Sequence, residues 1–310
     1  MRSNYDSWHY KYLQRKGYTS HDVVAKLRRI VGQKKIGHTG TLDPDATGVL
    51  PVCFGKATKL CDLLTDKDKT YETVLLLGRE TDTQDISGTV LSEKQTGTVT
   101  EADVRSVVAS FVGAYAQTPP MYSAIKIGGK KLYELAREGK TVERKPRNVE
   151  IFSIDILEMD LPHVKMRVHC SKGTYIRTLC NDVGAKLGCG GCMEELVRTK
   201  VSSFVLTEAK TLAEVENFVS DGRLSEIITP VDAMFAHYPA LCVTEKWDKF
   251  AYNGNALPKD AVGDVPDGHS ISDVHRVRLY NSKEEFIGLY DYKKSENKYK
   301  LVKMFYTPDV

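Results

Sequence analysis

Residues 37–51 of this chain read Gly-His-Thr-Gly-Thr-Leu-Asp-Pro-Asp-Ala-Thr-Gly-Val-Leu-Pro. The three glycines, two prolines and three threonines predict a loop held in a special conformation rather than a regular helix or strand. Loops carried on a rigid scaffold hold a large share of binding and catalytic groups. This loop offers His38, Asp43 and Asp45. Asp43 precedes a proline, which favours an extended backbone, so it is either a functional carboxylate or a group that only caps a turn.

A phosphate-binding loop is a further interpretation of a glycine-rich segment, and the sequence does not favour it. The pattern of such loops requires Ser or Thr after Gly-Lys, whereas Ala57 follows Gly55 and Lys56. Leu50 stands where the first glycine of that pattern is needed. The loop is therefore not predicted to bind a nucleotide phosphate.

The whole chain has the composition of a globular protein. Its 310 residues are 41% hydrophobic and 27% charged, enough for a substantial core and, by length, for two domains. No apolar run approaches the roughly 18 residues of a membrane helix, and the first residues lack the apolar core of a signal peptide. Seven cysteines in a chain of this size do not suggest a disulfide framework. We expect a cytoplasmic protein with reduced thiols and no membrane association.

Basic residues are concentrated in two segments, although the net charge is only +3. Residues 1–35 carry nine Lys and Arg against two acids, and residues 126–147 carry eight against three. If each segment presents its charges on one face, the resulting field would attract a polyanion such as nucleic acid. The alternative is that both are solvated helix faces.

Hydrophobic periodicity predicts a mixture of helices and strands. Helices are expected from a Thr19-Ser20 cap through Val31, and over 101–112, 175–187 and 211–219. Strands are expected over 71–77, 149–156 and 164–170. Short β-rich runs with turn signals between them follow residue 237 and predict a small separate β domain. The elements do not repeat as βαβ units, so the expected class is α+β.

Further sequence blocks follow the loop along the chain. They are Lys69-Thr70-Tyr71-Glu72, Gly78-Arg79-Glu80-Thr81-Asp82-Thr83, Gln117-Thr118-Pro119-Pro120, Tyr122-Ser123-Ala124, Cys170-Ser171-Lys172-Gly173-Thr174-Tyr175-Ile176-Arg177 and Leu196-Val197-Arg198-Thr199. Together with residues 37–60, these blocks closely resemble, in content and order, those of the TruB family of tRNA pseudouridine-55 synthases. The resemblance covers most of residues 17–204.

The resemblance implies a fold and a domain division. The fold is the pseudouridine-synthase fold, with a mixed, largely antiparallel sheet flanked by helices. Residues 1–235 would be the catalytic domain, including an RNA-clamping insertion at about 120–148. Residues 237–310 would form a β-barrel-like PUA-type RNA-binding domain.

The activity that the resemblance implies is that of a stand-alone, bacterial-type enzyme. It would convert the uridine at position 55, in the T-loop of tRNA, to pseudouridine. The enzyme would flip that base out of the RNA, break its glycosidic bond and re-form a carbon–carbon bond. No cofactor or metal is implied; the partner would be the T-arm of tRNA, the protein a monomer, and an accessory role in tRNA folding is possible within this family.

The same resemblance gives roles to the catalytic candidates. Asp43 would act at the ribose, either as a nucleophile at C1′ or as a base at C2′. Arg177 would pair with Asp43 and keep it ionised and aimed. Tyr71 would stack on the target base and help to remove the C5 proton, while Leu196 would pack on the other side of the pocket. By pattern alone, each of the last three could be an ordinary core or surface residue.

RNA-binding candidates also follow from the resemblance. His38 would take the place that the flipped base leaves in the RNA stack. Contacts to the RNA backbone are expected from Lys59, Lys172, Tyr175 and, within the insertion, Lys130, Lys131, Arg144 and Arg147. Individually, each cationic side chain could simply be solvated.

Three alternatives stay open at this point. A non-catalytic RNA-binding or tRNA-folding factor would keep the basic segments without needing Asp43, Tyr71 and Arg177 together. A catalytic subunit of a guide-RNA particle would usually carry longer, lysine-rich extensions. The pair Cys189 and Cys192 has the spacing of zinc and redox sites, but a zinc site needs two more ligands, and the family match puts this segment in a turn.

Overall fold

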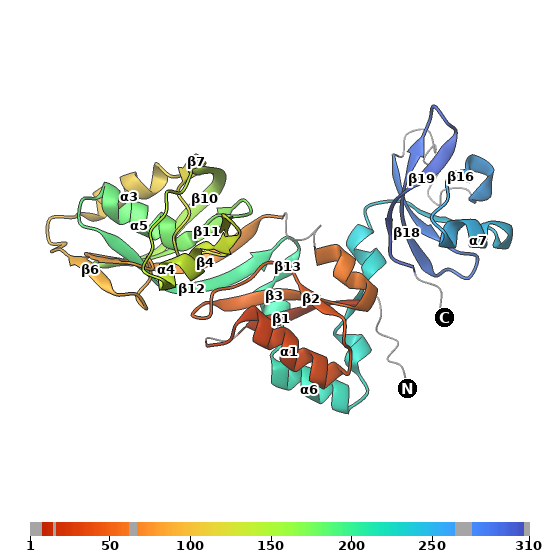
Figure 1. The fold of residues 1–310 in the computed structure, drawn as a ribbon, viewed down its shortest axis with the longest axis horizontal. Helices are drawn as coiled ribbons and strands as arrows, with labels where there is room; N and C mark the ends of the chain where they lie inside the picture. The colour runs from red at the N-terminus through yellow and green to blue at the C-terminus, as the bar shows by residue number, and fades with distance from the viewer. Residues whose placement is uncertain (1–7, 15–16, 62–66, 264–274, 307–310) are drawn as a thin grey trace.

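A mixed sheet of ten strands is the centre of the molecule in Figure 1, a computed structural model that describes residues 8–14, 17–61, 67–263 and 275–306. Along its main path the order is β14-β1-β3-β12-β4-β11-β10-β7, with β2 beside β3 and β13 beside β12. Its strands are β1 Trp8–Gln14, β2 Ile36–His38, β3 Thr47–Phe54, β4 Lys69–Leu77, β7 Gly113–Gln117, β10 Arg147–Asp160, β11 His163–Cys170, β12 Gly191–Val201, β13 Phe204–Val205 and β14 Thr229–Pro230. Only β3 and β12 pair in parallel among these strands. The expected mixed, largely antiparallel sheet is confirmed.

Three of the described helices start at capping boxes, two of them at caps expected from the sequence, Thr19 and Thr100. Thr19 with Asp22, Thr100 with Asp103 and Thr211 with Glu214 each form a reciprocal capping box. The helices are α1 Ser20–Val31, α3 Glu101–Ala109, α4 Leu132–Arg137, α5 Ile176–Lys186, α6 Leu212–Ser220 and α7 Glu245–Tyr252. Short 3₁₀ helices are η1 Gly55–Leu60, η2 Leu206–Glu208, η3 Leu224–Glu226, η4 Val231–Phe235 and η5 Lys259–Ala261. None of the helices that the structure describes is long and apolar enough to cross a membrane.

Two apolar clusters attach the helices to the main sheet. One joins α3 and α5 to β4, β10, β11 and β12 through residues such as Val108, Leu179 and Met166. The other joins α1 and α6 to β2 and β3. Each fully buried aliphatic side chain contributes about 1.5–3 kcal/mol to folding, so these clusters hold the helices firmly against the sheet.

The predicted loop over residues 37–51 is correct only in its middle. Its beginning belongs to β2 and its end belongs to β3, so residues 39–46 form the loop proper. Pro51 is tolerated inside β3 because it falls between the part of the strand that pairs with β12 and the part that pairs with β2. Gly48 is required there: its φ is +125°, and a Cβ would lie 2.3 Å from the Arg198 carbonyl oxygen. Local composition indicated a loop, but burial on both faces makes residues 47–54 a strand.

A second, smaller sheet forms the C-terminal part of the chain, at the right of Figure 1. Its order is β15-β17-β18-β19-β16, from β15 Ala240–Cys242, β16 Leu257–Pro258, β17 Arg276–Tyr280, β18 Phe286–Lys293 and β19 Lys298–Met304. The sheet is curled like part of a barrel, as expected for a PUA-type domain. Helix α7 was not predicted, because it has only eight residues, too few to show a helical period clearly, and half of them are charged.

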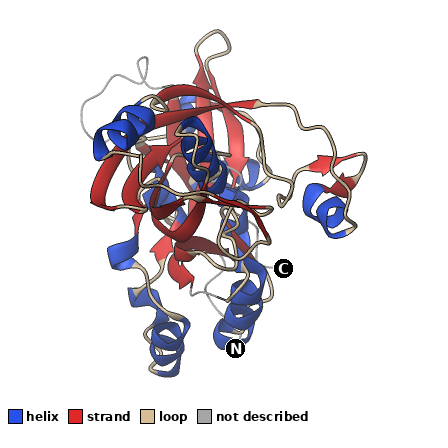
Figure 2. Ribbon diagram, turned by 90° about the vertical axis from the view of Figure 1, so that its left-hand side faces the viewer, coloured by secondary structure: helices blue, strands red, loops and turns tan. Residues whose placement is uncertain are grey.

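Two short hairpins leave the main sheet. One is formed by β5 Arg79–Thr81 and β6 Val90–Glu93. The other is formed by β8 Lys126–Ile127 and β9 Lys130–Lys131, is followed at once by α4, and projects from the side of the molecule in Figure 2. The second hairpin lies within the predicted insertion at about 120–148.

Candidate active site

The loop that carries Asp43 is fixed by contacts from three sides. The Leu42 side chain is buried in the α5 cluster, and its N–H donates to the Ser20 hydroxyl at 3.0 Å. The Asp43 carbonyl accepts from the Ala46 N–H at 3.0 Å and closes a turn over Pro44. The Pro44 carbonyl accepts from the Gly17 N–H at 2.7 Å. The backbone of Asp43 therefore closes a turn, while its carboxylate points elsewhere.

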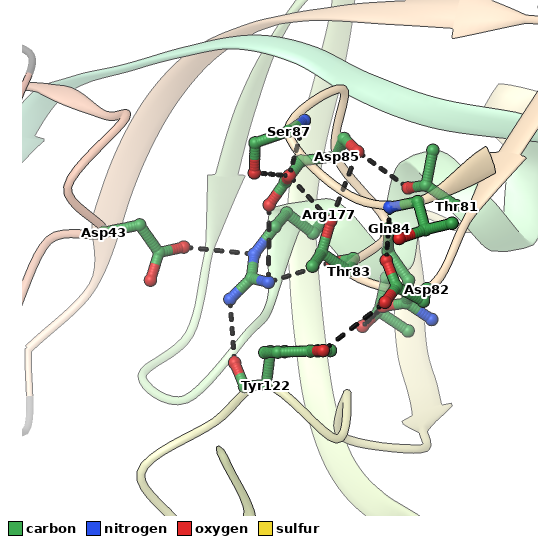
Figure 3. A network of polar contacts seen from close by, with 11 residues as sticks. Asp43, Thr81, Asp82, Thr83, Gln84, Asp85, Ser87, Tyr122 and Arg177 are labelled. Carbon is green, nitrogen blue, oxygen red and sulfur yellow. Dashed lines mark hydrogen bonds and ion pairs between the residues drawn. The ribbon is translucent and has the colours of Figure 1, made fainter. Parts of the chain in front are cut away.

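The Asp43 carboxylate faces Arg177 in the first turn of α5, as Figure 3 shows. The Arg177 Nε lies 3.0 Å from Asp43 Oδ2. The Arg177 side chain is 6% exposed and that of Asp43 is 45% exposed, so the guanidinium is buried while the carboxylate reaches open space. A fixed, buried guanidinium sets the direction of the carboxylate through a charge-assisted hydrogen bond.

The remaining donors of Arg177 hold two other segments. Nη1 donates to the Thr83 carbonyl at 2.9 Å and lies 3.5 Å from Asp85 Oδ2. Nη2 donates to the Tyr122 carbonyl at 3.0 Å. One side chain thus joins the Asp43 loop, the turn after β5 and the start of the insertion (Figure 3).

Asp85 is itself held in place by the turn that carries it. Its Oδ1 accepts from the Thr83 hydroxyl at 2.8 Å and from the Ser87 N–H at 3.0 Å. Its backbone carbonyl accepts from the Thr81 hydroxyl at 2.6 Å. The Tyr122 hydroxyl donates to Asp82 Oδ2 at 3.3 Å, which ties this turn to the insertion. Asp85 is therefore a second, oriented carboxylate behind Arg177.

A cavity of about 540 Å³ opens in front of Asp43. Its volume suits a nucleotide. Its lining residues are Gly40, Thr41, Leu42, Asp43, Lys69, Tyr71, Arg147, Asn148, Val149, Lys172, Gly173, Thr174, Tyr175, Ile176, Arg177, Leu196 and Arg198. Of the predicted site residues, this cavity brings together Asp43, Tyr71, Arg177, Leu196, Lys172, Tyr175 and Arg147.

Tyr71 and Leu196 form part of the cavity wall on the neighbouring strands β4 and β12. Burial raises the pKa of Tyr71 to about 12, although the adjacent Arg198 guanidinium acts to lower it. Tyr71 is therefore a neutral phenol at physiological pH. Leu196 is almost fully buried and supplies an apolar surface beside it.

Tyr175 lies at the N-terminus of α5, where Gln117 clamps its backbone. The Gln117 Oε1 accepts from the Tyr175 N–H at 2.8 Å, and its Nε2 donates to the Tyr175 carbonyl at 2.9 Å. Burial raises the pKa of the Tyr175 hydroxyl. The clamp fixes the first turn of α5 and, with it, Arg177.

His38 and Lys59 do not line this cavity. His38 is half-buried on β2, where burial and then the Arg198 charge lower its pKa. Lys59 belongs to η1 and donates to the Met304 carbonyl at 2.7 Å, so it bridges to the C-terminal sheet. Burial, and then the charges of Lys35, Lys303 and Lys56, lower its pKa. The RNA contacts expected of His38 and Lys59 stay predictions.

The predicted basic residues of the insertion have local partners. Lys130 lies 3.0 Å from Glu138, Lys131 donates to the Tyr133 hydroxyl at 3.1 Å, and Arg144 donates to the Pro119 carbonyl at 3.1 Å. Arg147, in contrast, is exposed and lines the cavity. Of the N-terminal basic residues, Arg2, Arg15 and Lys16 lie outside the described residues. So do residues 264–274 and 307–310 of the predicted 237–310 domain.

Several site residues were not singled out from the sequence. Asp85 lies among turn-forming polar residues, whose pattern gave no sign of a contact with Arg177. Gln117 and Arg198 lie within the sequence blocks but received no role. Arg198 carried no distinguishing signal, because its strand also contains the charged residues Glu194, Glu195 and Lys200.

The cysteine pair considered as a zinc or redox site is buried. Cys189 precedes the Gly190-Gly191 turn and Cys192 follows it, at the start of β12. In the described part of the chain, no three His, Cys, Asp or Glu side chains are grouped so as to hold a metal ion.

The geometry suits chemistry at a ribose. A carboxylate held in one direction by an arginine opens into a cavity of nucleotide size, beside a neutral phenol and an apolar wall. Such a carboxylate can attack an anomeric carbon or remove a neighbouring proton. Arg147 and Lys172 line the same cavity and can contact the phosphates of a bound nucleic acid.

Known proteins resemble this chain over nearly its whole length. Residues 28–176 match the family model of the TruB family pseudouridylate synthase N-terminal domain, and residues 177–236 match that of the tRNA pseudouridylate synthase B C-terminal domain. A tRNA pseudouridine synthase B of Lachnoclostridium phytofermentans is 53% identical over 94% of this chain and 96% of its own length. One of Clostridium acetobutylicum is 41% identical over 93% of this chain and 96% of its own length.

Solved structures resemble the fold as well. A chain in the crystal structure of a Cbf5-Nop10-Gar1 complex superposes with a TM-score of 0.70 at 26% identity, covering 97% of this chain and 86% of that one. A chain of the archaeal box H/ACA Nop10-Cbf5 complex gives a TM-score of 0.69 at 25% identity, covering 99% and 89%. The family matches and the close relatives show that this chain belongs to the TruB family of pseudouridylate synthases.

Proposed function

We propose that this protein isomerises the uridine at position 55, in the T-loop of tRNA, to pseudouridine. Family membership and relatives named tRNA pseudouridine synthase B at 41–53% identity support tRNA as the substrate and this isomerisation as the reaction. The single observation that carries the assignment to a site is the Asp43–Arg177 ion pair at the edge of a nucleotide-sized cavity. The guide-RNA alternative is not favoured, because the relatives named tRNA pseudouridine synthase B are 53% and 41% identical to this chain, whereas the chains from the H/ACA complexes are only 25–26% identical.

In this proposal the target uridine leaves the T-loop stack and enters the cavity, and the cost of unstacking is offset by backbone contacts. Asp43 then acts at C1′ as a nucleophile or at C2′ as a base, and Arg177 keeps it ionised and aimed. Tyr71 stacks on the uracil and Leu196 packs against its other side. His38 fills the place left in the RNA.

The remaining proposals concern organisation. Residues 1–235 act as the catalytic domain, with the insertion at about 120–148 clamping RNA, and residues 237–310 act as a PUA-like RNA-binding domain. The enzyme works as a monomer in the cytoplasm, where tRNA is, and needs no cofactor or metal. Lys59, Lys172, Tyr175, Lys130, Lys131, Arg144 and Arg147 contribute RNA contacts.

The test of the proposed function uses two RNAs, an isolated T-arm stem-loop and an unmodified full-length tRNA. Pseudouridine would be mapped by carbodiimide modification and reverse transcription. We expect a single new pseudouridine at the T-loop position in both RNAs, including after incubation with EDTA. Modification at another uridine, or none in either RNA, would overturn the proposal.

A further inference from the structure

Arg198 is a buried cation whose role nothing above assigns. Only 1% of it is exposed, in the middle of β12. Its Nε donates to the Val49 carbonyl at 2.9 Å and its Nη2 donates to the Gly40 carbonyl at 3.2 Å. Among the described residues, no carboxylate forms an ion pair with it. Burying a cation without a carboxylate costs several kcal/mol. The groups that surround Arg198 should therefore give the reason for its burial.

The neighbour that matters is Tyr71. The two residues are directly opposite each other on the antiparallel strands β12 and β4, and both line the cavity. Residues paired in this way have Cβ atoms about 4.5–5.5 Å apart. A guanidinium can only donate hydrogen bonds, so in their contact the Tyr71 oxygen accepts and the phenol proton stays free for another acceptor.

The charge of Arg198 favours an anion on Tyr71. Its charge and its contact both lower the pKa of the phenol, against the larger effect of burial. The other charged or titratable groups that act on this phenol are Asp43, from the loop, and Cys170, from β11, and both raise its pKa. Among these groups, Arg198 is therefore the source of stabilisation for a phenolate.

The proposed isomerisation needs one proton to be moved. When the glycosidic bond breaks, the electron pair stays on the uracil, whose N1 must gain a proton. When C5 bonds to C1′, the C5–H bond must break, its electron pair restores the C5=C6 double bond, and its proton must be accepted. One phenol can do both, by giving its proton to N1 and then taking the proton from C5, with no outside acid or base.

We propose that Arg198 is a positioning residue that holds the Tyr71 oxygen as an acceptor and stabilises its phenolate, so that Tyr71 carries the proton between N1 and C5. This inference rests on the proposed function. The competing explanation is that Arg198 only shapes the Asp43 loop through the Gly40 and Val49 carbonyls. The two explanations differ in which chemical step fails when the guanidinium is removed.

The experiment compares Arg198→Met with Lys200→Met, a basic-to-Met change at an exposed site of the same strand. Three T-arm stem-loops carry uridine, 5-deuteriouridine or 5-fluorouridine at the target position. 5-Fluorouridine can break its glycosidic bond and rejoin through C5, but it has no C5 proton to lose. Rates are measured in single turnover by mass spectrometry of the RNA.

We expect Arg198→Met to slow uridine conversion about 100-fold, the lower range of general acid–base catalysis, and to reveal a primary C5-deuterium isotope effect. Rearrangement of 5-fluorouridine should be slowed much less than that of uridine, because it needs only the proton transfer to N1 and no removal of a C5 proton, and Lys200→Met should match wild type throughout. Equal losses on uridine and 5-fluorouridine, without an isotope effect, would mean that Arg198 only shapes the loop and would overturn the proposal.

Two further variants guard against a folding defect. Arg198→Lys retains a cation and should recover part of the uridine rate; no recovery in a folded protein would contradict the proposal.

Adding Arg198→Met to Tyr71→Phe should slow uridine conversion little further, because the group on which Arg198 acts is already gone. Additive losses of the uridine rate in this double variant would overturn the proposal. If wild type converts none of the RNAs, the proposed function fails instead.

Discussion

At the scale of single residues, Arg177 organises the site. Its guanidinium meets the Asp43 and Asp85 carboxylates and the Thr83 and Tyr122 carbonyls, which belong to three separate segments. Removing one partner of a buried ion pair leaves an uncompensated charge and loose segments, whereas removing an exposed pair has little effect. In the Asp43–Arg177 pair, the arginine is the buried partner.

Arg177→Met should reduce the single-turnover rate on a T-arm stem-loop by at least about 100-fold, because the carboxylate loses both its orientation and a charge-assisted hydrogen bond worth about 1.5–3 kcal/mol. RNA binding, measured by filter retention, should change only a few-fold. The matched control is Arg167→Met, which removes an exposed arginine paired with Glu72 across β11 and β4. Equal rate losses in both variants would contradict a special role for Arg177.

The pH dependence of the rate follows from Tyr71. Burial raises the pKa of this phenol to about 12, so raising the pH from 7 to 10 should leave it protonated. If the neutral phenol is the working form, the single-turnover rate constant should show no ionisation of Tyr71 over that range. A tenfold rise per pH unit that disappears in Tyr71→Phe would show instead that a phenolate formed beforehand does the work.

Some features of the fold and the site could be predicted from the sequence and others could not, for physical reasons. Capping boxes are encoded within a few residues, so the starts of α1, α3 and α6 could be predicted. The contact of Asp85 with Arg177 depends on how a distant turn packs, and no local pattern records it. The burial of β3 on both faces likewise overrode glycine and proline signals that indicate a loop.

At the scale of elements, the cavity lies where the start of β10, the segment before α5 and the Asp43 loop meet. Arg147 and Lys172 come from the first two of these and line the cavity, whereas Lys130, Lys131 and Arg144 contact neighbours within or beside the insertion. Cations that line the cavity lie closest to the phosphates of a nucleotide bound in it. The elements around the cavity are therefore the better source of phosphate contacts.

Arg147→Gln with Lys172→Gln should weaken tRNA binding and lower the slope of log affinity against log salt by roughly 1.5–2, about one per lost phosphate contact. The control is Arg105→Gln, an exposed arginine on α3 that pairs with Glu101. Affinity would be measured at several salt concentrations. An unchanged slope in the double variant would mean that these two residues do not contact phosphate, and the insertion would then be the better candidate.

At the scale of the whole molecule, an apolar cluster joins the two sheets. It combines Val49, Leu60 and Phe204 from the main body with Leu289 and Phe305 from the C-terminal part. The Lys59 ammonium adds a hydrogen bond to the Met304 carbonyl. The chain joins its parts through a buried core, so the C-terminal sheet should contribute to the stability of the whole.

Phe305→Ala should lower the free energy of unfolding by about 3–5 kcal/mol, because it leaves a cavity between the two sheets. Phe250→Ala, at an exposed site on α7, is the control and should cost far less. Denaturant titration of both variants would measure the difference. Equal costs would show that the cluster does not couple the C-terminal sheet to the rest of the chain.

The most direct measurement of the central claim is tritium release from 5-tritiated uridine in a T-arm stem-loop. It would compare wild type, Asp43→Asn and Asp45→Asn, since Asp45 is an exposed carboxylate of the same loop. We expect wild type and Asp45→Asn to release tritium at similar rates. Asp43→Asn should release none while binding the RNA within a few-fold of wild type, because an amide keeps the shape but can neither attack nor accept a proton. Release by Asp43→Asn at a rate near wild type would contradict the account.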